Sequence, residues 1–253
     1  MPATKRLTLY NSVDSPYPHR VRLALEEAGA KYDIIWINLL SKPEWYKNVY
    51  SQAKVPFLVY GGPALHEGEV PSPEAETISE SMVILEFLVD LFPETHLLPT
   101  DPVQRAKARF FIKTTEEKFC KVFFSFIFLG GEVDSMLAAV EEMQALLPDA
   151  GFAVGRWSIA DAAFVPFLLR LDRSLKNIVG VFAEGVTKTT LAALYEPKFS
   201  RIRRYLEDNL ARDSMIKTWN EPAVMAQMGR RLDRMRRTGI INADLSVPVP
   251  KQQ

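Results

Sequence analysis

Ser15 stands at a turn whose residue types favour chemistry on a thiolate. The stretch Ser15-Pro16-Tyr17-Pro18-His19-Arg20 follows a strand-like apolar run at 7–10 and precedes the helical pattern of 21–25. Proline suits the first turn of a helix, where free N–H groups and the helix dipole favour a negative charge. A thiolate would therefore be stabilised beside the serine hydroxyl.

The thiol at this turn has to come from another molecule, because serine cannot form a mixed disulfide. A disulfide-handling protein would carry cysteine there, often as Cys-x-x-Cys. Cys120, the single cysteine among 253 residues, lies far along the chain in an aromatic helical run. The alternative is a plain N-cap serine, which the residue type fits equally well.

Overall composition excludes several classes of protein. Lys plus Arg and Asp plus Glu are both 31, so the formal net charge is zero and no global field attracts nucleic acid or an anionic membrane. One cysteine fits a reducing compartment, and the N-terminus enters a strand without an apolar signal region. No run reaches the roughly 18 apolar residues of a membrane-spanning helix. These features predict a cytoplasmic, soluble chain of two domains.

The hydrophobic period predicts an α/β domain followed by an all-helical domain. Prolines crowd between Pro93 and Pro102, so we expect domains at 1–94 and 102–240 and a loose tail at 241–253. Strands are expected at 5–10, 31–37 and 56–60, with a hairpin partner near 64–67, a surface insertion at 68–77, and helices at 17–28, after Pro43 and from about 80 to Pro93. Further helices are expected at about 102–128, 132–147, 158–173, 198–210 and 222–237, with irregular or short helical structure at 174–197.

Five stretches, in order along the chain, resemble the cytosolic glutathione transferases and their omega class in particular. The Ser15 turn resembles the omega active-site turn, which normally reads Cys-Pro-aromatic with an Arg three positions later. Ser41–Tyr46 resembles the segment whose Lys faces the glycyl carboxylate of glutathione, and Val55-Pro56 resembles the family's cis-proline. Ile78-Ser79-Glu80-Ser81 resembles its Glu-Ser pair for the γ-glutamyl end, and Ser158-Ile159-Ala160-Asp161 its helix-capping motif.

The resemblance implies a thioredoxin-like N-terminal domain followed by an all-helical glutathione-transferase C-terminal domain, assembled as a homodimer. Glutathione would be the co-substrate, and Ser15 the catalytic residue. The implied glutathione-binding residues are Lys42, Val55, Pro56, Glu80 and Ser81. Serine in place of cysteine departs from typical omega members and resembles serine-bearing fungal ones. This favours conjugation or a peroxidase-type reaction with hydrophobic electrophiles over thiol transfer.

The residue types agree with these implied roles. A proline opening a strand keeps Val55 extended, so the valine N–H and C=O can pair with a peptide. Glu80 and Ser81 at a helix start combine an acceptor for an ammonium with donors for a carboxylate, and Lys42 supplies a flexible positive charge. Each residue also has a purely structural alternative. Pro56 could be an ordinary edge-strand proline, Glu80 and Ser81 a plain helix cap, and Lys42 a solvated surface lysine.

The aromatic residues at 110–128 are more than one buried stripe requires, so some must face away from the bundle core. The resemblance implies that an apolar acceptor site lies between this helix and the Ser15 turn. The residues expected to line it are Tyr17, Phe123, Phe124, Phe126 and Arg170. Core and dimer packing would explain the aromatic residues, and a solvated face would explain the arginine. A non-catalytic, ligandin-type binder of aromatic or polyphenolic molecules therefore stays open as the second hypothesis.

Other functions have weaker support. Five arginines in 229–237 could touch nucleic acid, but no nucleic-acid motif accompanies them. The Gly-x-Ser-x-Gly elbow of a hydrolase is absent, and the three histidines lack metal-ligand spacing, so no metal is expected.

Overall fold

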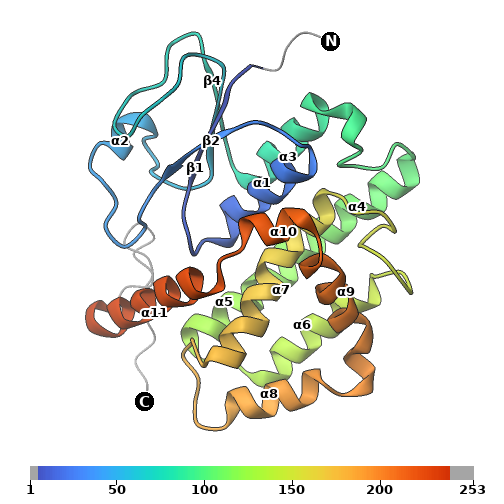
Figure 1. Ribbon diagram of the computed structural model, residues 1–253. Coiled ribbons are helices and arrows are strands. Elements are labelled where there is room, and N and C mark those ends of the chain that lie inside the picture. The colour runs from blue at the N-terminus through green and yellow to red at the C-terminus, as the bar shows by residue number, and fades with distance from the viewer. Residues whose placement is uncertain (1–4, 240–253) are drawn as a thin grey trace.

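The computed structural model describes residues 5–239, which form an N-terminal sheet domain and a C-terminal helical domain (Figure 1). The first domain contains β1 (Leu7–Asn11), α1 (Pro16–Glu27), β2 (Asp33–Trp36), α2 (Tyr46–Val49), β3 (Phe57–Tyr60), β4 (Glu76–Ser79) and α3 (Ser81–Leu91). Its strands form a four-stranded sheet in the order β2-β1-β3-β4. β1 runs parallel to β2, and β3 runs antiparallel to both β1 and β4.

Alternating side chains explain how helices cover both faces of this sheet. Leu7, Leu9 and Leu58 pack in one cluster with apolar residues of α1 and α3. The neighbouring Tyr10 and Phe57 point the other way, into a second cluster that includes Tyr46 of α2. Successive strand residues face opposite sides, so an apolar run such as that of β1 is buried on both faces and predicts a central strand.

The fourth strand lies later in the chain than the expected hairpin partner. It spans Glu76–Ser79 instead of the region near 64–67, and Thr77 pairs with Val59. The segment between these strands begins with Gly61 and Gly62, both at positive φ, and contains further prolines and glycines. Such residues disfavour regular pairing, so the chain returns to the sheet only at the β-branched pair Thr77–Ile78.

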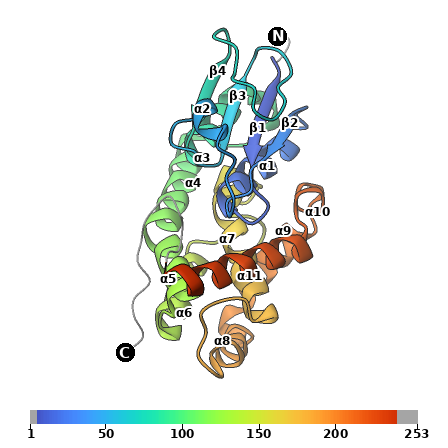
Figure 2. The same ribbon diagram turned by 90° about the vertical axis from the view of Figure 1, so that its left-hand side faces the viewer.

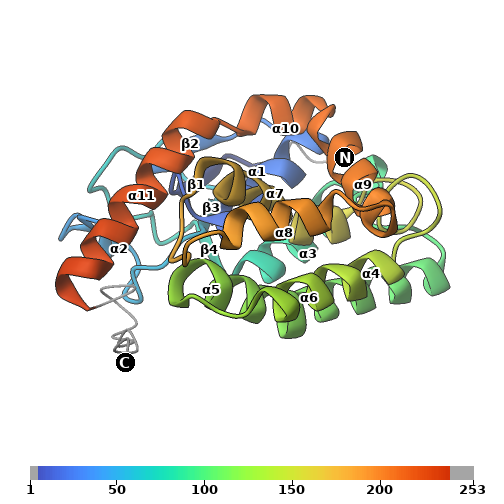
Figure 3. The same ribbon diagram turned by 90° about the horizontal axis from the view of Figure 1, so that it is seen from below.

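The second domain is helical. Its α-helices are α4 (Pro102–Thr114), α5 (Cys120–Leu129), α6 (Val133–Ala145), α7 (Ile159–Asn177), α8 (Val186–Leu194), α9 (Ser200–Leu210), α10 (Asp213–Thr218) and α11 (Glu221–Thr238). A π-helical turn at Thr115–Phe119 joins α4 to α5, so the long helix expected at 102–128 is locally widened. α8 lies in the region 174–197, where irregular or short helical structure was expected, whereas α10 was not predicted. Figure 3 shows α8 lying alongside α6 and α7.

α7 is the buried centre of the helical domain and packs against α1 of the sheet domain. It begins with the capping box expected at Ser158–Asp161, in which the Ser158 N–H donates to Asp161 Oδ2 at 2.8 Å. Asp161 is buried and also accepts hydrogen bonds from the Ala153 N–H and the Tyr205 hydroxyl, both at 2.8 Å. The motif therefore ties the start of the central helix to α9.

α11 crosses the front of α5 and α7 just below the sheet (Figure 2). This last described helix therefore lies at the junction of the two domains. No helix within residues 5–239 is long and apolar enough to cross a membrane. The tail expected at 241–253 lies outside the described residues.

Candidate functional site

A cavity of about 700 Å³ lies between the two domains. The N-terminal domain contributes the residues of the Ser15 turn together with Lys42, Tyr50, Val55, Pro56, Glu80 and Ser81. The C-terminal domain contributes Glu116, Phe123, Phe124, Phe128, Arg170, Met228 and Arg231. The structure therefore brings together every site residue expected from the sequence except Phe126.

Ser15 is the N-cap residue of α1, with Pro16 in the first helical turn. Its backbone is extended (φ −72°, ψ 130°), and within residues 5–239 its side chain makes no capping hydrogen bond. The helix position alone would have favoured a cap, so the hydroxyl is left for another partner at the cavity. The Ser15 carbonyl accepts a hydrogen bond from Arg170 Nη2 at 3.1 Å.

The Val55–Pro56 bond is cis, as the resemblance implied. It lies where the chain enters β3, and both residues line the cavity. The preceding carbonyl is fixed, because the Tyr46 hydroxyl donates to the Lys54 carbonyl at 2.7 Å. An extended ligand could therefore pair with the Val55 backbone at a rigid edge.

Lys42 lies in the loop before α2, and its Nζ donates to the Ala53 carbonyl at 2.8 Å. Partial burial, followed by the positive charges of Arg231, Lys47 and Lys54, lowers the pKa of Lys42 to about 8. The ammonium form is therefore in the majority at neutral pH. A ligand carboxylate would stabilise that form further.

Glu80 and Ser81 begin α3 and lie beside a buried arginine. Glu80 has φ 68°, a left-handed conformation that is uncommon for a residue with a side chain and that recurs at functional sites. Arg20 is fully buried and donates from Nη1 to Ser81 Oγ at 3.2 Å and from Nη2 to Glu116 Oε1 at 2.5 Å. One guanidinium thus holds a hydroxyl and a carboxylate on the same side of the cavity.

Glu116 was not predicted as a site residue. It belongs to the π-helical turn between α4 and α5, and π-helical turns often occur at functional sites. The available signal was a pair of acidic residues in an otherwise aromatic helix, but the sequence did not indicate that Arg20 would lie opposite.

Arg170, which was expected at the acceptor site, lines the cavity, and its guanidinium binds the backbone of the Ser15 turn. It donates to the carbonyls of Asp14 at 2.9 Å, Ser15 at 3.1 Å and Pro166 at 2.9 Å. Burial lowers its pKa to about 9, with the charge of Asp14 acting in the opposite direction. The alternative of a solvated arginine is wrong, because only 2% of Arg170 is exposed.

His19 completes the support of the turn from inside α1. Arg170 Nη1 lies 3.2 Å from His19 Nδ1, and His19 Nε2 lies 3.0 Å from Thr218 Oγ1. Burial and then the Arg170 charge hold the pKa of His19 well below its usual range. The imidazole is therefore neutral, accepting at Nδ1 and donating at Nε2 to the hydroxyl of α10.

Aromatic rings form one wall of the cavity. Tyr17 stacks on Phe124 with ring centroids 6.3 Å apart, and Phe124 meets Phe123 edge to face at 5.4 Å. Burial raises the pKa of Tyr17 to about 12, so its hydroxyl stays protonated. Phe126 instead packs in the core, where its ring lies 5.4 Å from that of Phe182; the described lining does not include it.

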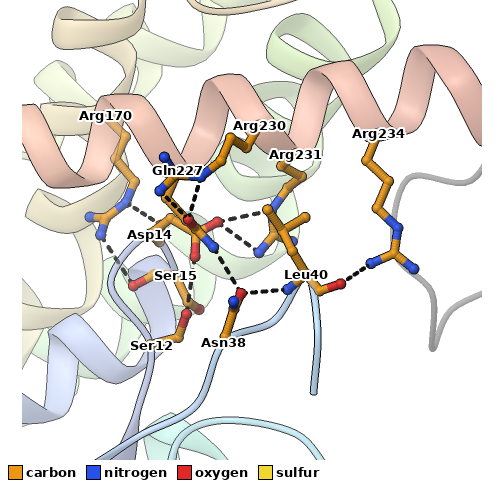
Figure 4. A network of polar contacts seen from close by, with 10 residues as sticks. All are labelled: Ser12, Asp14, Ser15, Asn38, Leu40, Arg170, Gln227, Arg230, Arg231 and Arg234. Carbon is orange, nitrogen blue, oxygen red and sulfur yellow. Dashed lines mark hydrogen bonds and ion pairs between the residues drawn. The ribbon is translucent and has the colours of Figure 1, made fainter. Parts of the chain in front are cut away.

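α11 supplies charged and polar partners to two loops of the sheet domain (Figure 4). Arg231 forms an ion pair with the buried Asp14, with Nη2 2.7 Å from Oδ2. Gln227 Nε2 donates to Asn38 Oδ1 at 3.0 Å, and Arg234 Nη1 donates to the Leu40 carbonyl at 2.5 Å. At least two arginines of the 229–237 cluster, Arg231 and Arg234, therefore join the two domains.

Comparison with known proteins agrees with this architecture. A family model described as the N-terminal domain of glutathione S-transferases matches residues 14–91. A probable glutathione S-transferase of Nicotiana tabacum is 32% identical over 210 residues, covering 79% of this chain and 84% of that one. Glutathione S-transferase omega-2 of Mus musculus is 32% identical over 116 residues, and the match covers 46% of this chain and only 40% of the mouse protein.

Solved structures extend the comparison to the whole fold. Glutathione transferase Omega 2S from Trametes versicolor, in complex with 2,4-dihydroxybenzophenone, is 45% identical with a TM-score of 0.84. The match covers 87% of this chain and 96% of that one. A thioredoxin-like sheet domain followed by a helical domain is thus the shared architecture. The chain belongs to the glutathione transferase family, and its solved relatives include fungal omega-class members.

Proposed function

We propose that the chain is a glutathione transferase in which the Ser15 hydroxyl stabilises the thiolate of bound glutathione. The observation that carries the proposal is the position of Ser15, whose hydroxyl is not used as a helix cap among the described residues. The same cavity is lined by the other residues expected to bind glutathione.

The free energy needed to stabilise the thiolate of bound glutathione is small enough for a few polar contacts to supply. A free thiol has a pKa of about 8.5, so only a few per cent is thiolate at neutral pH. A hydrogen bond from a hydroxyl to an anion contributes about 1.5–3 kcal/mol, and the α1 N-terminus adds about 0.3–1 kcal/mol. Together they contribute about 1.8–4 kcal/mol, which would lower the pKa of the thiol by about one to three units at 1.36 kcal/mol per unit. The thiol proton then passes to solvent.

The three charged groups of glutathione, two carboxylates and one ammonium, would each have a partner among the residues that line the cavity. Lys42 would bind the glycyl carboxylate, and the Val55 backbone would pair with the cysteinyl residue. Glu80 would accept from the γ-glutamyl ammonium, while Ser81 and the N–H groups of the α3 start would donate to its carboxylate. Arg20 supports this end, because it donates to Ser81 from behind.

In conjugation, the sulfur would form a bond to an electrophilic carbon while the leaving group departs with its electron pair. The aromatic wall of Tyr17, Phe123 and Phe124 would hold the hydrophobic part of the electrophile. In the peroxidase-type alternative, the thiolate would attack the terminal oxygen of a hydroperoxide, the O–O bond would break, and the alkoxide would leave and take up a proton to give the alcohol. A second glutathione thiol would then attack the sulfur of the resulting sulfenic acid, which releases glutathione disulfide and water.

A second candidate function is non-catalytic binding of aromatic or polyphenolic molecules. It is favoured by the aromatic wall and by the Trametes Omega 2S structure, which holds 2,4-dihydroxybenzophenone. Such a binder would use the same cavity without activating a thiol.

Two measurements on the wild-type chain separate the candidates. The first is glutathione-dependent turnover of an activated aryl halide and of an organic hydroperoxide. The second is the thermal shift caused by glutathione and by 2,4-dihydroxybenzophenone. Turnover with either electrophile supports the transferase. Stabilisation by the benzophenone with no glutathione-dependent turnover of either electrophile would support the binder instead.

We also propose that two copies of the chain associate through α3 and α4. Val83, Val103 and Phe110 on these helices are 56%, 61% and 59% exposed, and such a dimer would cover them. Arg109 of α4 joins the two helices by two hydrogen bonds of 3.0 Å to Glu86 of α3.

A further inference from the structure

Arg231 binds the carboxylate of Asp14 on the cavity side of α11. Its Nε and Nη2 lie 2.9 and 2.7 Å from Asp14 Oδ2, while the Ser12 hydroxyl donates to Oδ1 at 3.0 Å. Asp14 is 4% exposed and directly precedes Ser15. A carboxylate this deeply buried needs its cation, because an uncompensated buried charge is strongly unfavourable.

The Ser15 turn is therefore held from two sides by two arginines (Figure 4). Arg170 of α7 fixes the backbone through the Asp14 and Ser15 carbonyls. Arg231 of α11 fixes the Asp14 side chain. The turn that carries Ser15 is thus tied to a helix far along the chain, the ion-pair partners being 217 positions apart.

The same helix face also holds the loop that leads to Lys42. Arg230 donates from Nε and Nη2 to Gln227 Oε1, which turns the amide nitrogen of Gln227 toward Asn38. Asn38 Oδ1 accepts from both Gln227 and the Leu40 N–H. Arg234 then binds the Leu40 carbonyl, two residues before Lys42. Positions 227, 231 and 234 follow the i, i+4, i+7 spacing of one helical face.

We propose that Arg231 is a positioning residue of the glutathione site, acting through Asp14 on the Ser15 turn. The inference rests on the proposed function, because it assumes that the Ser15 hydroxyl meets the sulfur of glutathione. It assigns a role in ligand binding to the arginine cluster.

The test compares two ligands by titration calorimetry. Glutathione presents a thiolate to Ser15, whereas S-methylglutathione presents a thioether, which is a weak acceptor. The variants are Arg231→Gln, Arg231→Lys and, as the matched control on the same helix, Arg236→Gln. Arg236 has a side chain that is 60% exposed and pairs with Asp233 within α11. Circular dichroism melting verifies that each variant is folded.

Arg231→Gln should weaken glutathione binding by about tenfold, the effect of losing one hydrogen bond to an anion. S-methylglutathione should lose less than about threefold, because little thiolate stabilisation is at stake. Arg231→Lys keeps the charge but not the paired Nε and Nη2 donors to Asp14, so it should recover only part of the glutathione affinity lost in Arg231→Gln. Arg236→Gln should bind like wild type. In an Asp14→Asn background, Arg231→Gln should cause little further loss.

Several outcomes would overturn the proposed role of Arg231 and leave the proposed function of the chain intact. These are wild-type affinity for glutathione in the Arg231→Gln variant, equal losses for the two ligands, or an Arg231→Lys variant as weak as Arg231→Gln. A wild-type chain that binds neither ligand would instead overturn the proposed function, and the inference with it.

Discussion

Replacing Ser15 with alanine tests the chemistry of the site with little disturbance to the fold. The Ser15 hydroxyl caps no N–H group in the described part of the chain, and Pro16 still begins α1 after the substitution. The backbone hydrogen bond from Arg170 to the Ser15 carbonyl also remains possible. The variant should therefore lose the interaction with the sulfur while its free energy of unfolding changes by no more than about 0.5 kcal/mol.

The size of the chemical effect follows from that one hydrogen bond. Its loss removes about 1.5–3 kcal/mol of preference for the thiolate, so the pKa of bound glutathione should rise by about 1–2 units. The N–H groups and dipole of α1 stay in place and keep a small part of the stabilisation. At pH values below both thiol pKa values, the glutathione-dependent rate should fall about ten- to a hundredfold.

The assay is a pH titration of the ultraviolet thiolate absorbance of bound glutathione, paired with rates over the same range. Asp101→Ala is the matched control, because Asp101 caps α4 with a real hydrogen bond of 2.8 Å from the Gln104 N–H. That variant should lose about 1 kcal/mol of stability and keep the wild-type thiol pKa. The reasoning is refuted if Ser15→Ala leaves the thiol pKa and the rate unchanged, or if it destabilises the chain as much as Asp101→Ala does.

Further predictions concern other parts of the molecule. Ser15→Cys should gain disulfide exchange with glutathione, since sulfur can form the mixed disulfide that oxygen cannot; an inert variant in a thiol-transfer assay would contradict this. Burial lowers the pKa of Lys42 to about 8, so S-methylglutathione affinity should fall as pH rises through that value, and Lys42→Arg should abolish the fall in calorimetry. Asp161→Asn should cost about 2–3 kcal/mol in urea unfolding by upsetting buried hydrogen bonds, whereas the exposed Asp149→Asn should cost almost nothing. Phe110→Glu should shift the sedimentation coefficient to that of a monomer, and a wild type already monomeric at micromolar concentration would rule out the proposed dimer.

The sequence predicted those parts of the molecule that local patterns determine. β1 and α1 were expected because an apolar run, a proline turn and a helical period follow one another, and their observed bounds lie close to those expected. The capping box at Ser158 was predictable for the same reason, since its partners lie within one helical turn. Residues lining the cavity could be named only because several such local motifs resemble one family.

The departures from prediction share a physical cause, which is that side-chain partners far apart in sequence decide them. Phe126 and Phe124 are two residues apart on one aromatic helix, yet one packs in the core against Phe182 and the other faces Tyr17. The helical period cannot say which face meets the core when both faces are apolar. α10 was missed because its six residues are too few to establish a period.

The arginines illustrate how burial changes the meaning of a charged residue. In the sequence, Arg231 belongs to a run that resembles a solvated or nucleic-acid-binding face, and Asp14 is an ordinary loop residue. In the structure Asp14 is buried, and its negative charge is balanced by the positive charge of Arg231. This ion pair spans the two domains. A buried charge is tolerated only where its partner is fixed, so the pair constrains where α11 lies relative to the Ser15 turn. The residue that would act on the thiol is therefore oriented by a contact that no local pattern could have revealed.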